Sequence, residues 1–239
     1  MDLKETEILG DDVNTHWYYL SKAKALTNLL GDFSPKKIMD IGAGSGYFSK
    51  SLLNKTAAKE AWCVDISYEK EESSRENGKP IHFVRSVGET DVDLVLLMDI
   101  LEHVDDDVGL LQEYVDKVPY GTKFLISVPA FEWLWSSHDD FLEHRRRYTC
   151  HQLENVVKLT GLSIDRSCYY FCSVLLLAIA TRLISRNTEK KESQLKKHSK
   201  LVNALLKMLC SLDFLFFKKN KIGGLTVFCY AEKKEKKHL

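Results

Sequence analysis

The chain has 239 residues, 44% of them hydrophobic, which is enough for one α/β domain with a buried core. Its 34 basic and 34 acidic side chains give a formal net charge of zero, so the overall charge gives no signal for nucleic-acid or membrane binding. The longest apolar run, 169–180, is shorter than the roughly 18 residues that span a bilayer, which excludes it as a transmembrane helix.

The predicted elements begin with a helical cap over residues 1–34, which lacks the pattern of a signal peptide. After the cap, short β-rich runs alternate with segments long enough for helices, which favours an α/β fold with a mostly parallel sheet between helices. Because the six cysteines form no CxxC pair, we expect a cytoplasmic protein with free thiols. From the chain length, we expect a single domain spanning 1–239. Seven strands are predicted, at 37–41, 61–65, 81–85, 93–98, 124–128, 163–169 and from 225 onward.

A glycine-rich turn follows the first predicted strand. The stretch IMDIGAGSGYFS places Gly42, Gly44 and Gly46 just before a helix that begins near Tyr47, so the backbone there can bend tightly and approach a ligand. Dinucleotide-binding folds use the spacing G-x-G-x-x-G at this point, whereas the third glycine here comes one residue early. Asp40, two residues before the first glycine, would repel a pyrophosphate but attract an ammonium group.

A second acid, Asp65, ends the second predicted strand in the sequence AWCVDIS. An acid at the tip of a second strand can accept hydrogen bonds from both hydroxyls of a ribose. Together with Asp40, it indicates a ligand with a nucleoside at one end and an amino-acid group at the other. S-adenosylmethionine has both.

The motifs DIGAGSG, VDIS and MDILEHVDD, in this order, resemble those of class I S-adenosylmethionine-dependent methyltransferases, in particular the type 11/12-like group. The resemblance runs from about residue 17 to 161. It implies a Rossmann-like seven-stranded sheet with an antiparallel last strand, the methionine moiety over the glycine turn and the ribose on Asp65. The cofactor contacts expected on this basis are Trp17, Asp40, Gly42, Gly44, Gly46, Asp65, Ile66, Ser86, Met98 and Asp99.

Two positions depart from the family's pattern. Many relatives carry an acid after the third strand to meet the adenine amino group, whereas this chain has Ser86. The N-terminal stretch HWYYLSKAKAL resembles a helix that folds over the cofactor in some relatives, with Lys22 where arginine is expected. Lysine would still neutralise a carboxylate as a point charge. Trp17 and Tyr18 are either cofactor contacts or packing residues.

Asp99, Glu102 and His103 follow the fourth predicted strand and share one face if a helical turn begins there. In one interpretation Asp99 caps the turn and the other two satisfy backbone groups. In the other, the spacing resembles the E-x-x-E-H motif of ubiquinone-biosynthesis O-methyltransferases, in which such a cluster is thought to hold a divalent ion. Asp99 replaces the first glutamate of that motif, so a metal stays an open alternative and is not predicted.

The segment after the fifth strand, SVPAFEWLWSSHDDFLEHRRRYTC, gathers polar and aromatic residues where α/β folds bind their substrates. Methyl transfer to a weakly acidic hydroxyl needs the removal of its proton. His144 and His138 are the candidate bases, with Asp139 orienting one of them. The competing interpretation is a surface loop whose tryptophans pack and whose arginines face water.

The HRRRYT pattern within this segment resembles a methyltransferase subgroup associated with cell-envelope saccharide and lipid-linked pathways. The resemblance implies that the arginines at 145–147 bind a phosphate or carboxylate of the acceptor, which they could do with two hydrogen bonds each.

A helical insertion, 171–221, is expected between the sixth and seventh strands, with two apolar helices joined by a polar segment. Residues 182–239 hold 15 basic against 5 acidic side chains. Leucine- and phenylalanine-rich helices with interleaved lysines are typical of segments that lie on an anionic membrane. The alternative is that these helices cover the sheet or form a dimer interface. Nucleic-acid binding is not predicted, because aromatic residues do not alternate with the lysine clusters.

The sequence therefore predicts an enzyme that moves the methyl group of S-adenosylmethionine to a small-molecule acceptor, leaving S-adenosylhomocysteine. We expect the acceptor to be an oxygen on a saccharide-, quinone- or lipid-linked substrate. The protein would be a cytoplasmic monomer or homodimer, with peripheral contact to the inner face of a membrane. The alternatives are a non-catalytic cofactor-binding regulator or membrane adaptor, and an NAD-dependent oxidoreductase, which the early third glycine disfavours.

Overall fold

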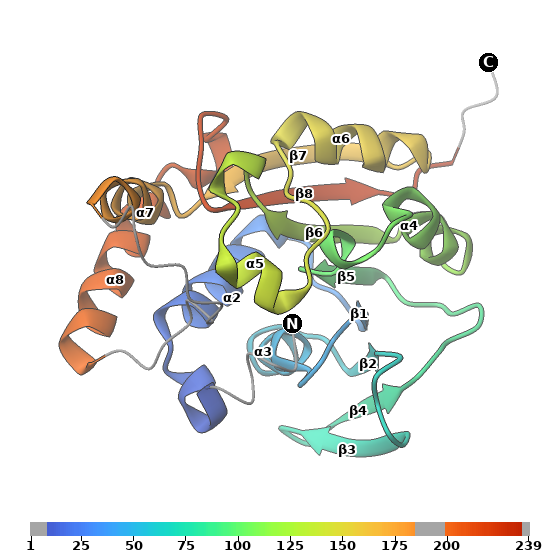
Figure 1. Cartoon of the computed structure of the whole chain (residues 1–239). Helices are drawn as coiled ribbons and strands as arrows, with labels where there is room; N and C mark the ends of the chain where they lie inside the picture. The colour runs from blue at the N-terminus through green and yellow to red at the C-terminus, as the bar shows by residue number, and fades with distance from the viewer. Residues whose placement is uncertain (1–8, 185–198, 236–239) are drawn as a thin grey trace.

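A single eight-stranded sheet forms the centre of the computed structural model, which describes residues 9–184 and 199–235 (Figure 1). The strands lie in the order β3-β4-β2-β1-β5-β6-β8-β7. Strands β4, β2, β1, β5 and β6 are parallel, and β8 is antiparallel to both β6 and β7. The strands are β1 (Lys37–Ile41), β2 (Glu60–Val64), β3 (Glu72–Glu76), β4 (Lys79–Val84), β5 (Leu94–Met98), β6 (Lys123–Pro129), β7 (Ser163–Tyr170) and β8 (Thr226–Glu232).

This arrangement confirms the predicted Rossmann-like α/β sheet with an antiparallel last strand, but the predicted number of seven strands is wrong. The additional strand, β3, forms an antiparallel hairpin with β4 at the edge of the sheet. Its sequence, ESSRE, has no apolar residue and its side chains are mostly exposed, so hydrophobic periodicity gives no signal for it. The turn residues Asn77 and Gly78 both adopt positive φ angles, of 51° and 77°. An Asn-Gly pair is the strongest short-range hairpin signal, and it could have revealed this strand.

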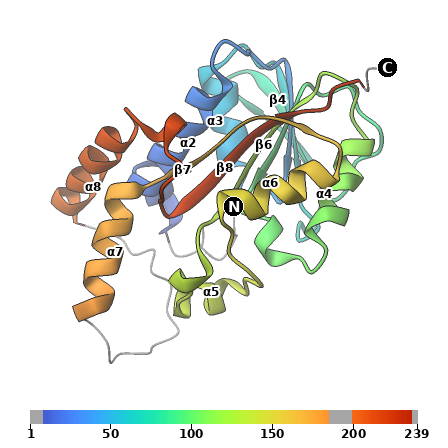
Figure 2. The same cartoon turned by 90° about the horizontal axis from the view of Figure 1, so that it is seen from above.

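Both faces of the sheet are buried by helices, as the view from above shows (Figure 2). In β5, Leu94, Leu96 and Met98 face one core while Val95 and Leu97 face the other, because side chains alternate along a strand. Helices α2 and α3 contribute to the first core, and α4 and α6 to the second. The helices are α2 (Trp17–Leu30), α3 (Tyr47–Lys55), α4 (Asp107–Asp116), α5 (Ser137–Leu142), α6 (Cys150–Leu159), α7 (Cys172–Ile184) and α8 (Lys200–Asp213).

Four short 3₁₀ segments complete the described elements: η1 (Gly10–Asn14), η2 (Leu101–His103), η3 (Glu132–Leu134) and η4 (Phe217–Lys219). Within the predicted N-terminal cap, η1 and α2 are helical, and residues 1–8 lie outside the described residues. The helix predicted near Tyr47 begins at that residue, after Gly46 in a left-handed conformation.

The predicted insertion contains two helices, α7 and α8, between β7 and β8. The polar segment predicted to join them, 186–198, lies outside the described residues. Helix α8 packs against α2 at one end of the molecule (Figures 1 and 2). No helix in the described ranges has both the length and the hydropathy needed to cross a bilayer. All six cysteines are free thiols, as expected. That the whole chain forms one domain stays a prediction.

Candidate functional site

Three non-glycine residues with positive φ angles mark one edge of the sheet. Asp99 and Phe171 directly follow β5 and β7, and Phe131 follows β6 by two residues, with φ angles of 57°, 64° and 58°. The three strands end at the same edge, because β5 and β6 are parallel and both β6 and β7 are antiparallel to β8. A positive φ is strained for residues with a side chain, and such strain concentrates at functional sites. This edge is therefore the candidate site.

The glycine turn after β1 lies at the same edge. Gly42 has a φ of +63°, and a Cβ atom there would come within 2.5 Å of Ile100 Cδ1. Gly46 has a φ of +70°, and its Cβ would meet Cys63 Sγ at 3.0 Å. Gly44, between them, also has a positive φ, of 52°. Since side chains at 42 and 46 would be both strained and crowded, the turn requires glycine for its own conformation as well as for any ligand.

The Asp65 carboxylate fixes the glycine turn from the end of β2. Its Oδ2 accepts a hydrogen bond from the backbone N–H of Gly44 at 3.0 Å. Its Oδ1 accepts from the backbone N–H of Ser67 at 3.0 Å and from the Ser67 hydroxyl at 2.5 Å. The Tyr68 hydroxyl donates to the Gly44 carbonyl at 2.6 Å, so the two loops are tied together twice. The half-buried Asp65 therefore lies directly beside the turn, as predicted from the strand ends.

Asp40 is buried on β1 beneath this turn. Its Oδ2 accepts a hydrogen bond from the Ser49 hydroxyl at 2.9 Å, while Oδ1 has no partner among the described residues. Burial raises the pKa of Asp40 to about 6. A buried carboxylate oxygen without a partner is costly, and it is available to accept from a cationic donor.

The other expected cofactor residues differ in their surroundings. The Ile66 side chain, next to Asp65, is 81% exposed, and Ser86 is also exposed. Met98 is fully buried, and Trp17 is buried with its ring edge-on to Phe171 at a centroid distance of 5.7 Å. The Trp17 contacts are those of a packing residue, and its contact with a cofactor stays a prediction.

Asp99 forms an ion pair with Lys22 of α2. The Lys22 side chain is completely buried, and its amine also donates to the Tyr18 hydroxyl at 3.1 Å. The Ser127 hydroxyl donates to Asp99 Oδ1 at 3.1 Å. Burial alone would lower the pKa of Lys22, but the charge of Asp99 and the Tyr18 oxygen raise it above its usual value. Lys22, which the sequence suggested as a partner for a ligand carboxylate, is therefore paired with a carboxylate of the chain itself.

The structure brings His144 and Asp139 together, whereas the sequence left open which of the two candidate histidines Asp139 would orient. The His144 Nδ1 lies 2.9 Å from Asp139 Oδ1, and the Arg147 guanidinium donates to both carboxylate oxygens at 2.7 and 2.9 Å. Burial would raise the pKa of Asp139, but the hydrogen bonds from His144 and Arg147 hold it well below its usual value. His138, the second candidate base, is half-buried on α5. The role of Arg147 was missed because nothing in its spacing pairs it with Asp139.

His144 also lies beside Glu102 and His103 of η2. The His103 and His144 rings meet edge to face, with centroids 4.8 Å apart. One ligand atom from each of the three side chains lies within 4.8 Å of the others, so the cluster could hold a divalent ion. Glu102 is buried and neither carboxylate oxygen has a hydrogen-bond partner among the described residues. Burial, with the nearby charge of Asp99, raises the pKa of Glu102 well above its usual value.

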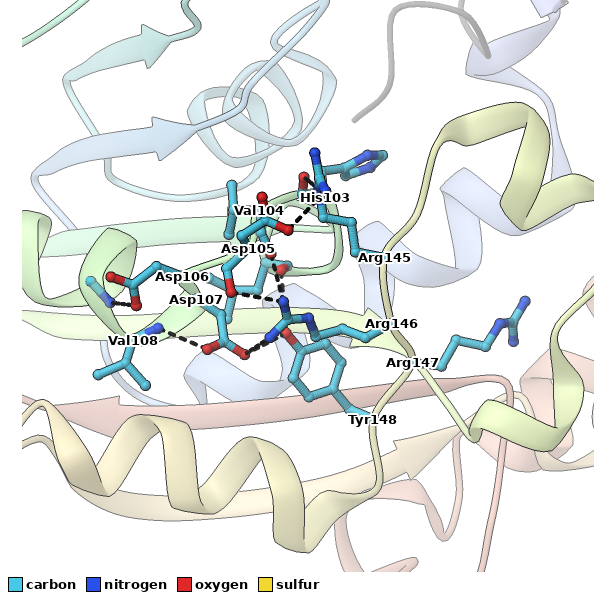
Figure 3. Close-up of polar contacts among 12 residues, drawn as sticks. His103, Val104, Asp105, Asp106, Asp107, Val108, Arg145, Arg146, Arg147 and Tyr148 are labelled. Atoms are coloured by element: carbon cyan, nitrogen blue, oxygen red, sulfur yellow. Dashed lines mark hydrogen bonds and ion pairs between the residues drawn. The ribbon is translucent and has the colours of Figure 1, made fainter.

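The arginines expected to bind an anionic acceptor group contact the chain itself (Figure 3). Arg145 donates through Nε to the His103 carbonyl at 3.0 Å and through Nη1 to Asp105 at 2.8 Å. Arg146 donates to the carbonyls of Val104 and Asp105, at 3.0 and 2.8 Å. Both side chains are thus directed at the segment after β5, whereas Arg147 points away from it (Figure 3).

Tyr148 completes this link between the two loops. Its hydroxyl donates to Asp107 Oδ2 at 2.8 Å and lies 3.2 Å from the Leu101 carbonyl oxygen. The backbone N–H of Arg145 donates to the Glu102 carbonyl at 2.8 Å. These contacts fix the segment 145–148 on η2 and thereby hold His144 next to His103.

Comparison with protein families finds that residues 15–167 match the model of the methyltransferase domain. Comparison with curated proteins finds no match.

Solved structures with the same fold are numerous, and the three named below share 15–17% sequence identity with this chain. A chain of the complex between the Haloferax volcanii Trm112 methyltransferase activator and a protein described as a methyltransferase has a TM-score of 0.64 at 16% identity, covering 99% of this chain and 96% of that chain. A Thermotoga maritima S-adenosylmethionine-dependent methyltransferase has a TM-score of 0.61 at 15% identity, with coverage of 97% and 98%. Haemonchus contortus phosphoethanolamine N-methyltransferase 2, in complex with S-adenosylmethionine, has a TM-score of 0.60 at 17% identity, covering 98% of this chain and 57% of that chain. At these identities, the likeness shows the fold alone.

Proposed function

Because the chain belongs to the methyltransferase-domain family, we propose that it transfers the methyl group of S-adenosylmethionine to a hydroxyl oxygen on a saccharide-, quinone- or lipid-linked acceptor. The protein is an S-adenosylmethionine-dependent methyltransferase by family and fold. The choice of an oxygen acceptor rests on the pairing of His144 with Asp139. A hydroxyl must give up its proton during the transfer, and this pair could remove it. Membrane contact and the oligomeric state stay predictions.

The residues of the glycine turn fit the cofactor. Gly42, Gly44 and Gly46 would lie under its methionine moiety, and Asp65 would accept hydrogen bonds from the ribose, beside the exposed Ile66 and Ser86. The Oδ1 of Asp40, which has no partner among the described residues, suits the ammonium group. When bound, S-adenosylmethionine supplies an electrophilic methyl group on a sulfonium centre.

The chain's own contribution to the reaction is proton removal and positioning. Since His144 Nδ1 donates to Asp139, its Nε2 is left as the atom that can take a proton from an acceptor hydroxyl. Asp139 would stabilise the imidazolium that forms, and Arg147 keeps Asp139 ionised. His138 is the second candidate for the base. We propose no metal in this reaction.

The cofactor assignment is tested by titrating the purified chain with S-adenosylhomocysteine in a calorimeter. Replacing Asp65 with alanine removes charge-assisted hydrogen bonds to the ribose, each worth about 1.5–3 kcal/mol. The two bonds, one from each ribose hydroxyl, total about 3–6 kcal/mol, so we expect the affinity to fall about 100-fold or more. Asp91→Ala is the matched control, since Asp91 is an exposed acid that forms an ion pair with Lys37. Stabilisation by NAD, with no uptake of S-adenosylhomocysteine, would overturn the assignment.

The affinity for S-adenosylhomocysteine should also depend on pH through Asp40. Below its pKa of about 6 the carboxyl is protonated and no longer attracts an ammonium, so affinity falls as pH drops through 6. Asp40→Asn should bind more weakly at pH 7 and lose this dependence. The stability of the ligand-free protein should change with pH in the opposite direction. Because the folded pKa lies above the unfolded value of 3.8, the free energy of unfolding decreases as pH rises from 3.8 to about 6. If the affinity for S-adenosylhomocysteine depends on pH equally in wild type and Asp40→Asn, Asp40 is not the partner of the ammonium group.

A further inference from the structure

Helix α8 is held firmly on its inner face. Its Asn203 side chain accepts a hydrogen bond from the backbone N–H of Trp17 at 2.8 Å and donates to the Thr15 carbonyl at 2.9 Å. Cys210 is part of the hydrophobic core, and Leu206 packs against this core. Asp213, at the end of α8, accepts from the backbone N–H of Ser173 on α7 at 2.9 Å. The orientation of α8 is therefore fixed, and with it the side chains that face outward.

The outer face of α8 is apolar and exposed, although an outer face is normally polar. Apolar residues recur at i, i+4, i+7 and i+11, which places them on one side of the helix. Two more exposed apolar residues follow its end. We call these the α8 stripe: Leu201, Leu205, Met208, Leu212, Leu215 and Phe216, each between 52% and 80% exposed. Monomeric soluble proteins rarely leave such a continuous patch uncovered, so the stripe marks an interaction surface.

The charge around the α8 stripe is strongly positive. Residues 199–221 contain five lysines and a single acid, Asp213, whose carboxylate is engaged with Ser173. An apolar stripe with a basic rim complements a surface that is apolar inside and negatively charged outside, and an anionic bilayer has this composition.

A basic groove of about 510 Å³ adjoins the end of the α8 stripe. Phe214, which directly precedes Leu215 and Phe216, lines it, and the Lys24 amine lies over the Phe214 ring at 4.3 Å from its centroid. The groove holds three lysines against one acid, so a lipid phosphate could be accommodated beside the inserted side chains. Its lining residues are Lys24, Thr27, Asn28, Gly31, Asp32, Lys55, Phe214 and Lys218.

We propose that the α8 stripe docks the protein on an anionic lipid bilayer, with its apolar side chains at the boundary between headgroups and acyl chains and the groove lysines on lipid phosphates. Helix α2 packs against α8 and also carries Lys22, the partner of Asp99. The docked protein therefore has the candidate site one helix away from the membrane surface. The proposal goes beyond the methyl transfer itself and uses none of the residues assigned to it.

Sedimentation of the full chain with lipid vesicles tests this docking. Wild-type protein should bind vesicles of phosphatidylcholine mixed with phosphatidylglycerol, bind phosphatidylcholine alone much more weakly, and be released by salt. The double variant Leu205→Ser/Met208→Ser should lose about tenfold or more in partitioning, because two apolar side chains no longer insert. Leu159→Ser is the matched control: Leu159 is 72% exposed on α6, outside the stripe, and this variant should bind as wild type.

A second pair, Lys24→Glu/Lys218→Glu, should weaken binding to the anionic vesicles while leaving the weak binding to phosphatidylcholine unchanged. Circular dichroism and thermal unfolding of each variant verify that it folds. Vesicle binding that is equal for wild type and the stripe variant would overturn the proposal. So would a wild-type dimer in light scattering that becomes a monomer in Leu205→Ser/Met208→Ser without any vesicle binding, since that result assigns the stripe to a second copy of the chain.

Discussion

Replacing Lys22 with methionine is expected to lower the free energy of unfolding by about 3 kcal/mol. Methionine fills a similar volume, but it leaves the Asp99 carboxylate without the cation that compensates its burial. Removal of one partner of a buried ion pair typically costs 3–5 kcal/mol. We expect the lower end of this range, because the Asp99 side chain remains 24% exposed and water can screen part of its charge. Equilibrium unfolding in urea measures the difference.

The double variant Lys22→Met/Asp99→Asn is the control for this prediction. Asparagine carries no charge and can still accept the hydrogen bond from Ser127, so most of the lost stability should return. Lys37→Met provides a second comparison, because Lys37 pairs with the exposed Asp91, and surface pairs contribute little. If Lys22→Met and Lys37→Met lose equal amounts of stability, the buried pair does not have the importance assigned to it.

The strands in the centre of the sheet could be predicted because most of their residues are apolar. Strand β1 has its predicted bounds, and β5 consists entirely of buried residues. Runs of this kind indicate strands covered on both faces, which are parallel strands flanked by helices. The edge strand β3 lacks this signal because its side chains face solvent, so only its turn, Asn77-Gly78, could have indicated it.

The site was predictable where it depends on strand ends and not where it depends on contacts across the fold. Asp65 and the glycine turn lie together because β1 and β2 are parallel neighbours that end at the same edge. In contrast, Lys22 and Asp99 are 77 residues apart, and each alone resembles a ligand-binding residue. A single sequence does not indicate that two opposite charges neutralise each other. Arg145 and Arg146 likewise resemble residues that bind an anionic substrate, because their contacts with the segment after β5 are not visible in the sequence.

Replacing His144 with alanine is expected to lower the rate of methyl transfer by about 10²- to 10⁴-fold, the usual contribution of a general base. The affinity for S-adenosylhomocysteine should stay unchanged, because His144 lies beside His103 and Asp139 and has no described contact with the glycine turn. Formation of S-adenosylhomocysteine from S-adenosylmethionine, measured over a panel of quinols, saccharides and lipid-linked saccharides, reports the rate. Calorimetry reports the affinity.

Three further variants separate proton removal from a structural role of His144. His151→Ala is the matched control, since His151 is an exposed histidine at the start of α6. Asp139→Asn should also slow transfer, because asparagine cannot stabilise the imidazolium and leaves Arg147 without its ionic partner. His138→Ala tests the second candidate base. The His144 side chain is only 6% exposed, so its removal opens a space lined by the site, and added imidazole should restore part of the activity of His144→Ala. A rate that is unchanged in His144→Ala and reduced in His138→Ala would transfer the role of base to His138, and unchanged rates in both would exclude either histidine as the proton acceptor.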